Sequence, residues 1–336
     1  MRTFRCTCGA RIFFENTQCL ACRRQLGFLP NALVLSAIET QGNGTFATPH
    51  GEYVKCSNYV EQGVCNWMVP SGAGNGLCQA CGLNRIIPTL TPENRALWAE
   101  VETAKRRLIY GLDRLHLPVK SKHDDEENGL AFDIKSDTPQ ARVLTGHDDG
   151  LITINLSEAN PAQREQIRMS LRERYRTMLG HFRHEIGHYY WDRLVRGSPS
   201  LPRFRELFGD EQSDYGKALT RHYAAKPDPN YAESFVSTYA AAHPWEDFAE
   251  TFAHYLHVED TLETAQHFGL TTELPAAPSV AEIDDFEKLM SEWYELTITL
   301  NALNRSMGMP DAYPFALSLA VKAKMAFVHD LVRRAR

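Results

Sequence analysis

The sequence lacks several features that would place it outside the ordinary globular proteins. No run of about 18 uncharged apolar residues occurs, so we expect no membrane-spanning helix. The opening residues, Met1 to Cys6, contain no apolar run, so we expect no secretory signal. The net charge of −6 is too acidic for a protein that coats nucleic acid. With 43% apolar residues among 336, the chain can bury a sizeable core in one large or two unequal domains.

Cysteine is absent after residue 81, although eight cysteines occur up to that point. A secreted protein held by disulfides rarely confines its cysteines in this way. We therefore expect a cytoplasmic protein, because thiols in a reducing compartment bind metals more often than they pair. This distribution divides the chain into a cysteine-rich head, residues 1–90, and a body, residues 91–336.

The cysteines fall into two sets with the spacing of zinc ligands. Four thiolates satisfy a tetrahedral zinc ion and leave no open position for water, so both sites would be structural. An exchange of ligands between the two sets remains open on spacing alone. The first set is Cys6, Cys8, Cys19 and Cys22, and the second is Cys56, Cys65, Cys78 and Cys81.

The first thirty residues hold five arginines and one glutamate. Such a charge balance suits an acidic protein surface or nucleic acid. No stacking pattern of aromatic residues alternates with these arginines, which argues against nucleic acid. The pattern favours a solubilising charged rim or a protein partner at the head.

The body is predicted to be mostly helical with a short sheet, which gives an α+β fold class. Caps and apolar periodicity predict helices at 91–115, along one continuous stripe from 160 to 194, and at about 244–258, 279–305 and 313–334. Strands are expected at 129–134, 142–146 and 151–155. The last two form a hairpin around His147-Asp148-Asp149-Gly150, and a lone histidine beside such a turn is usually solvated.

A metal-binding pattern lies on the predicted helix that ends at residue 194. In His184-Glu185-Ile186-Gly187-His188 the two histidines are i and i+4, so they point the same way and can bind one zinc ion. Glu185 lies beside the metal and can accept a proton from water. Asp192 follows one turn later, where it either orients a ligand or forms a surface charge near Arg196.

A second pair of acidic residues lies on the helix expected at 244–258. Glu246 and Glu250 are also i and i+4. A zinc ion with two histidine ligands needs a third protein ligand and an open fourth position. Either glutamate can bind the metal, and the other can accept a hydrogen bond from a ligating histidine. The alternative for an isolated pair of this kind is a solvated acidic face.

This two-helix pattern resembles the gluzincin metallopeptidases, whose third ligand is the first glutamate of an E-x-x-x-E segment. Residues 246–250 are similar to that segment in lethal-factor-type peptidases, where a tyrosine seven residues earlier faces the substrate. The resemblance implies that Glu246 binds zinc and that Glu250 hydrogen-bonds the free ring nitrogen of His184. It also implies that Tyr239 donates a hydrogen bond to the developing oxyanion.

The whole chain also resembles a bacterial family of zinc-binding metallopeptidases with an N-terminal zinc ribbon, on residues 181–192 and 243–247. The resemblance implies a zincin-like body, one catalytic and two structural zinc ions, and a peptide or protein substrate. An extended peptide could pair with the strand at 151–155. Two alternatives are a non-catalytic zinc-binding adaptor or regulator and a zinc hydrolase of a non-peptide amide. Glu185 favours an enzyme, because an adaptor needs no base beside the metal.

Overall fold

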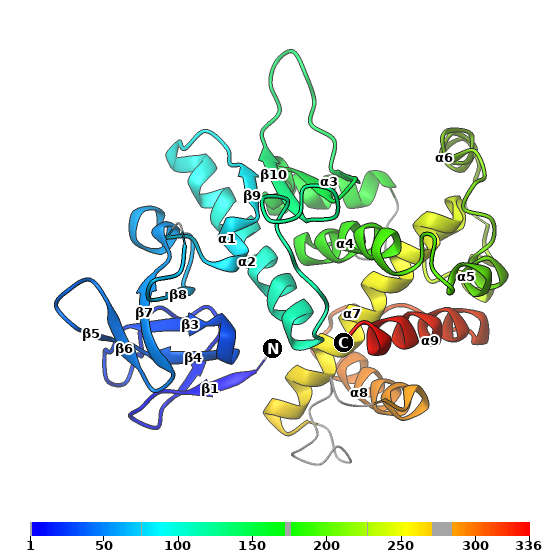
Figure 1. Cartoon of the computed structure of the whole chain (residues 1–336). Helices are drawn as coiled ribbons and strands as arrows, with labels where there is room; N and C mark the ends of the chain where they lie inside the picture. Colours follow the sequence, from blue (N-terminus) through cyan, green and yellow to red (C-terminus); the bar gives the residue numbers. More distant parts are fainter. Residues whose placement is uncertain (1, 75, 172–175, 227, 271–283) are drawn as a thin grey trace. The chain divides into compact units, whose positions relative to one another are not determined.

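The structure is a computed structural model that describes residues 2–74, 76–171, 176–226, 228–270 and 284–336 (Figure 1). The chain divides into two compact units. Unit 1 contains residues 1–114, 119–146 and 151–164, and unit 2 contains residues 115–118, 147–150 and 165–336. The expected boundary after residue 90 rests on composition alone and stays a prediction.

Short antiparallel strands form the first half of unit 1. β1 (Thr3–Arg5) pairs with β2 (Arg11–Phe13), and β3 (Leu26–Leu29) pairs with β4 (Val34–Ala37). A four-stranded sheet follows in the order β5 (Glu39–Thr40), β6 (Phe46–Thr48), β7 (Gly51–Lys55) and β8 (Met68–Pro70). The intervening helical turns are η1 (Pro30–Ala32), η2 (Asn58–Gln62) and α1 (Gln79–Gly82).

An aromatic cluster provides much of the core beneath these strands. The ring of Phe28 lies 4.8 Å from Phe14 and 4.8 Å from Trp67, between ring centroids. Tyr110 of α2 (Pro92–Arg114) joins the cluster, 5.9 Å from Phe28. Offset and edge-to-face aromatic pairs stabilise a small core beyond the area they bury. Helix α2 therefore belongs to the same core as the cysteine-rich strands.

A second four-stranded sheet follows, and three of its strands lie in unit 1. Its order is β11 (Gly146–Asp148), β12 (Leu151–Asn155), β10 (Ala131–Lys135) and β9 (Asn84–Ile86), and the turn η3 (Leu156–Ala159) follows β12. β10 pairs in parallel with both β12 and β9. The expectation that residues 151–155 offer a free edge is wrong, because β12 lies between two strands and its backbone is already paired.

Residues 160–194 form two helices where one continuous helix is predicted. They are α3 (Pro161–Leu171) and α4 (Met178–Leu194), and residues 172–175 lie outside the described residues. Thr177 has an extended backbone, and its hydroxyl accepts a hydrogen bond from the Gly180 amide at 2.9 Å. A threonine in this conformation caps a new helix, so the apolar stripe continues across a break.

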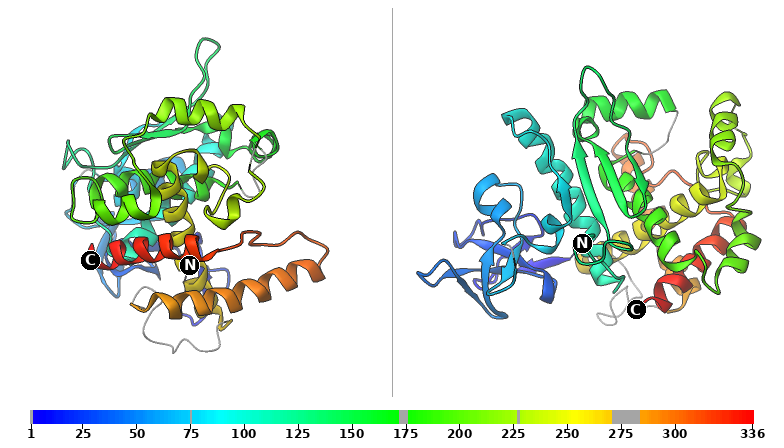
Figure 2. Two further views of the ribbon diagram at one scale, coloured as in Figure 1. Left: turned by 90° about the vertical axis from the view of Figure 1, so that its right-hand side faces the viewer. Right: turned by 45° about the horizontal axis from the view of Figure 1, so that its top comes forward.

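Unit 2 is helical and is organised around α7 (Pro244–Phe268). The helices α4, α5 (Leu201–Phe208), α8 (Phe286–Ser306) and α9 (Leu319–Arg334) pack on α7 (Figures 1 and 2). α6 (Tyr215–Ala224) packs on the short turn η5 (Ala240–Ala242), and η4 (Tyr231–Glu233) lies between them in sequence.

The helical predictions for unit 2 are confirmed in part. α7 is longer than expected, α8 and α9 begin later than expected, and α5 and α6 are not predicted at all. The expected start at 279 lies outside the described residues up to 283. None of the described helices combines the length and apolar character needed to cross a membrane. The α+β class is confirmed, with a strand-rich head that contains two clusters of four cysteines and a largely helical remainder.

Helices α4 and α7 approach most closely at a glycine. A Cβ atom on Gly187 would lie 2.8 Å from Ala249 Cα and 3.0 Å from the Ala249 carbonyl oxygen. Only a residue without a side chain allows two helix backbones to come this near. Gly187 lies between His184 and His188 on α4, and Ala249 lies between Glu246 and Glu250 on α7. The contact therefore brings the two histidines and the two glutamates together.

We predict that Gly187→Ala destabilises the fold. The added methyl group meets backbone atoms that cannot move aside, and overpacking of this kind costs about 1–3 kcal/mol. The intrinsic helix preference of alanine offsets about 1 kcal/mol of that cost. Denaturant unfolding should therefore show a net loss of stability.

Gly216→Ala on α6 is the matched control, because its nearest neighbour would be Asp214 Oδ1 at 3.7 Å, an ordinary contact. It should unfold at the same denaturant concentration as the wild type or a higher one. Equal midpoints for the two variants would contradict the close approach of α4 and α7.

Candidate functional site

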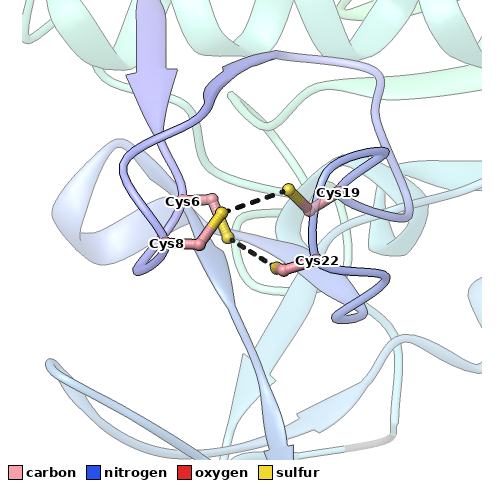
Figure 3. Close-up of side chains that lie close together, drawn as sticks. All are labelled: Cys6, Cys8, Cys19 and Cys22. Atoms are coloured by element: carbon pink, nitrogen blue, oxygen red, sulfur yellow. Dashed lines mark hydrogen bonds between the residues drawn. The ribbon is translucent and has the colours of Figure 1, made fainter.

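The first four cysteines converge from two turns of unit 1 (Figure 3). Cys6 and Cys8 follow β1, and Cys19 and Cys22 lie in the loop before β3. The sulfur atoms of Cys6 and Cys22 are 3.6 Å apart, and those of Cys8 and Cys19 are 3.8 Å apart. None of these four cysteines forms a disulfide. Cys8 is exposed, so this cluster is open to solvent on one side.

The second four cysteines form a fully buried cluster. The sulfur atoms of Cys65 and Cys78 are 3.7 Å apart, and none of the four residues is more than 3% exposed. Backbone amides donate to two of the sulfur atoms, from Trp67 to Cys65 and from Cys78 to Cys56. Such donors favour the thiolate form. Each cluster contains the four cysteines of one predicted set, so no ligand is exchanged between the two sets.

Both clusters have the dimensions of a tetrahedral zinc site. A Zn–S distance of about 2.3 Å places the sulfur atoms about 3.8 Å apart, close to the observed separations. A buried cation lies beside the second cluster. Lys105 is fully buried, and its ammonium group is 2.8 Å from Glu102 Oε1, while Glu102 Oε2 is 3.9 Å from the Cys81 sulfur. The hydrogen bond with Cys56 raises the pKa of Cys81, but those with Cys65 and Cys78 and the nearby Lys105 charge outweigh it and lower the pKa to about 7.

A third group of candidate metal ligands forms where α4 meets α7. His184 Nε2 lies 3.0 Å from Glu246 Oε2, and His188 Nε2 lies 3.4 Å from the same oxygen. The two histidine nitrogens are 3.2 Å apart. His188 is 3% exposed and Glu246 is 1% exposed. Three donor atoms from two helices therefore face one buried point.

The donor set fits zinc in chemistry and in size. Tetrahedral ligands about 2.0–2.1 Å from zinc are about 3.3–3.4 Å from one another, which matches the three separations. Glu246 Oε2 is buried and accepts no hydrogen bond from the described residues. A buried carboxylate oxygen without a hydrogen-bond donor is costly. A metal ion at this point removes that cost, and two imidazoles with one carboxylate are a common zinc ligand set.

The outward-facing atoms of the same residues are held by hydrogen bonds. His184 Nδ1 lies 2.6 Å from Glu250 Oε1, and the Ser237 hydroxyl donates to Glu250 Oε2 at 2.6 Å. With Nδ1 donating to Glu250, the Nε2 lone pair of His184 points to the common centre. His188 Nδ1, by contrast, is buried and has no hydrogen-bond partner among the described residues.

The electrostatics of this centre favour a positive charge. Burial alone lowers the pKa of His184, but the Glu246 and Glu250 carboxylates outweigh it and raise that pKa well above its usual value. Burial raises the pKa of Glu250, and its contact with His184 more than reverses this and lowers the pKa to about 2. Two carboxylates thus stabilise a cation at the point that the histidine nitrogens face.

Glu185 and Tyr239, the two predicted catalytic residues, lie near the same centre. The ring of Tyr239 is 5.8 Å from that of His184. Burial, followed by the nearby charge of Glu246, raises the pKa of Tyr239, and Glu185 adds to the shift. Tyr239 therefore keeps its proton and can donate a hydrogen bond. Glu185 is 8% exposed, and no hydrogen bond or ion pair to it occurs among the described residues.

Asp192, Asp247 and His243 also lie in or near the two motifs, but their side chains have partners outside the group of His184, His188 and Glu246. Asp192 forms an ion pair with Arg196, at 2.5 Å, and makes no hydrogen bond to His188. The ion pair agrees with the predicted charge near Arg196, but the Asp192 side chain is only 15% exposed and is therefore not a free surface charge. Asp247 binds Lys324 at 2.6 Å. His243 caps α7 by accepting the Trp245 amide at Nδ1.

Three further residues lie near the centre, and the sequence interpretation did not predict them as part of the site. The Tyr215 hydroxyl donates to Glu246 Oε1 at 2.6 Å, and the Trp245 ring lies 4.0 Å from the His188 ring. His147 stacks on His188 at 6.1 Å, so the expectation that it is solvated is wrong. Trp245 directly precedes the candidate ligand Glu246, and this adjacency was its only sequence signal. Tyr215 and His147 lie far from the motifs, so no spacing could have identified them.

Comparison with known proteins gives relatives along the whole chain. An uncharacterized protein of Mycobacterium tuberculosis and another of Mycobacterium bovis are each 44% identical over 342 residues, which covers 99% of this chain and 95% of the relative. No solved structure matches. Residues 3–92 match a zinc-ribbon domain model, and residues 94–331 match the model described as "Putative zinc-binding metallo-peptidase". The chain therefore belongs to this zinc-binding metallo-peptidase family and carries a zinc ribbon at its N-terminus.

Proposed function

We propose that the protein is a gluzincin-type zinc peptidase that hydrolyses peptide bonds in a peptide or protein substrate. One observation carries the proposal. Three donor atoms, from His184, His188 and Glu246, lie 3.0–3.4 Å apart around one point, and Glu185 is next in sequence to His184. A site with three protein ligands leaves a fourth position open, as catalytic zinc sites do.

The surrounding side chains supply the remaining chemistry of amide hydrolysis. Zinc, when bound, acts as a Lewis acid on the scissile carbonyl and makes water more acidic. Glu185 accepts the proton of the attacking water and passes it to the leaving amine. Tyr239 keeps its proton at neutral pH and donates a hydrogen bond to the oxygen on which negative charge develops. Glu250 holds His184 in the tautomer that leaves Nε2 free for the metal.

The carboxylate of Glu185 separates this function from the alternative of a zinc-binding adaptor. An adaptor needs the ligands but gains nothing from a nearly buried carboxylate beside them, because burying an unpaired charge is costly. The two cysteine clusters serve as structural zinc sites in this proposal. They stabilise a head whose strands are too short to hold a large core.

Zinc content tests the assignment of all three sites. We predict three zinc ions per chain by elemental analysis of gently purified protein. On dialysis against a chelator, the site of His184, His188 and Glu246 should empty first, because three ligands hold zinc less firmly than four thiolates. The site that includes the exposed Cys8 should follow, and the buried site of Cys56 should be last. A content of one zinc per chain would contradict the two structural sites.

The role of Glu185 is tested by Glu185→Gln. The amide cannot accept the proton, so we predict that hydrolysis of a proteome-derived peptide library falls by at least about 10²-fold while zinc content stays the same. Mass spectrometry of the cleaved peptides measures the loss. Glu206→Gln on α5 is the control, because that side chain is 63% exposed and forms an ion pair with the exposed Arg203. Cleavage at the wild-type rate by Glu185→Gln would refute the peptidase mechanism.

The two glutamates of α7 should differ in their effect on zinc. Glu246→Ala removes a ligand and should leave the third site largely empty. Glu250→Ala removes only the acceptor that orients His184, so zinc binding should weaken by roughly 10–100-fold. Titration of zinc against a chromophoric chelator compares the two variants. If Glu250→Ala loses the third zinc and Glu246→Ala retains it, the two roles are reversed.

A further inference from the structure

Tyr215 lies at the start of α6, against the first turn of α7. Asp214 caps α6 by accepting a hydrogen bond from the Lys217 amide at 3.0 Å. The Tyr215 ring lies edge-on to His243 at 5.3 Å and to Trp245 at 5.9 Å. These contacts place the phenol of a separate helix beside the residue that directly follows Trp245, which is Glu246.

The hydroxyl of Tyr215 gives the two oxygen atoms of Glu246 different surroundings. It donates to Oε1 at 2.6 Å, a short bond of the kind that a phenol forms with an ionised carboxylate. Oε2 receives no hydrogen bond from the part of the chain that the structure describes, and it faces the ring nitrogens of His184 and His188. One oxygen is thus occupied by the protein, and the other is directed at the metal position.

The chain before Tyr215 is anchored to α7 as well. His243 Nδ1 accepts from the Trp245 amide at 3.1 Å, so Nε2 carries the ring proton and donates to the Ser213 carbonyl at 3.0 Å. The residue that caps α7 therefore also holds the backbone two positions before Tyr215. Two hydrogen bonds thus join the first turn of α7 to the N-terminus of α6, one at Ser213 and one at Tyr215.

We propose that Tyr215 is a positioning residue that confines Glu246 to a single zinc-binding oxygen. The inference rests on the proposed function, because it takes Glu246 as the third ligand. A carboxylate with both oxygens free can bind a metal through both of them and fill the position that catalysis needs for water. By holding Oε1, the phenol keeps that position open and fixes the rotamer of Glu246 before zinc arrives.

The test is Tyr215→Phe, which removes one oxygen atom and keeps the ring contacts with His243 and Trp245. The substitution should leave the fold intact, because the ring stays in place, and it should lower the unfolding midpoint of the zinc-free protein, because Oε1 of the buried Glu246 loses its donor. Tyr223→Phe is the control, because it removes the same atom from the last turn of the same helix, where the side chain is 61% exposed. Each holoprotein is treated with chelator until only the cysteine-bound zinc remains, and the third site is then titrated with Zn²⁺ and, separately, with Co²⁺.

We expect Tyr215→Phe to bind Zn²⁺ roughly 10–100-fold more weakly than the wild type, the usual effect of losing a group that holds a ligand. Its Co²⁺ absorption should lose intensity and shift, because the second oxygen of Glu246 joins the metal and adds a ligand. Tyr223→Phe should match the wild type in both measurements. An unchanged Co²⁺ spectrum in Tyr215→Phe overturns the proposal, even if the affinity falls. A site that is merely less rigid binds the metal more weakly, but it does not gain the second oxygen of Glu246 as a ligand.

Glu246→Ala in the same titration separates this inference from the proposed function. If Glu246→Ala no longer binds Zn²⁺ in the third site while Tyr215→Phe has the wild-type affinity and spectrum, only the role of Tyr215 fails. If Glu246→Ala binds Zn²⁺ like the wild type, the ligand assignment itself fails, and the proposed function fails with it.

Discussion

The close contact of α4 and α7 at Gly187 and Ala249 is the constraint on which the candidate active site depends. A side chain at Gly187 would overlap the α7 backbone, with its Cβ only 2.8 Å from Ala249 Cα. Because the helices meet there, the residues one turn apart on α4 face those one turn apart on α7. The glycine within the histidine motif is thus as necessary to the geometry as the histidines, although it binds nothing itself.

Hydrogen bonds within the protein orient two of the three candidate ligands. His184 Nδ1 is hydrogen-bonded to Glu250, and Glu246 Oε1 accepts a hydrogen bond from Tyr215. Each of these two residues therefore has one polar atom satisfied by the protein and one directed to the centre. His188 differs, since the ring of Trp245 packs on it and no hydrogen bond orients it. Hydrogen bonds fix two ligands and aromatic packing fixes the third, which is the support that a preorganised metal site requires.

Local chemistry made several features predictable from the sequence, and long-range contacts account for those that were not. The cysteine spacing predicted both clusters, and the cap at Thr91 and the proline at the first position of α7 predicted two helix starts. The i, i+4 spacing predicted which histidines share a face. The break at Thr177 was missed because the apolar stripe continues in phase across it. The interior position of β12 and the contact of Tyr215 with Glu246 were not predictable, because each depends on partners distant in sequence.

The central claim is that two histidines and one glutamate from α4 and α7 hold a zinc ion beside Glu185. Anomalous X-ray scattering from crystals of the purified protein, recorded on both sides of the zinc absorption edge, tests it most directly. The account predicts a zinc peak within about 2.0–2.2 Å of His184 Nε2, His188 Nε2 and Glu246 Oε2, in addition to one peak in each cysteine cluster. Peaks in both cysteine clusters with none between α4 and α7 would contradict it.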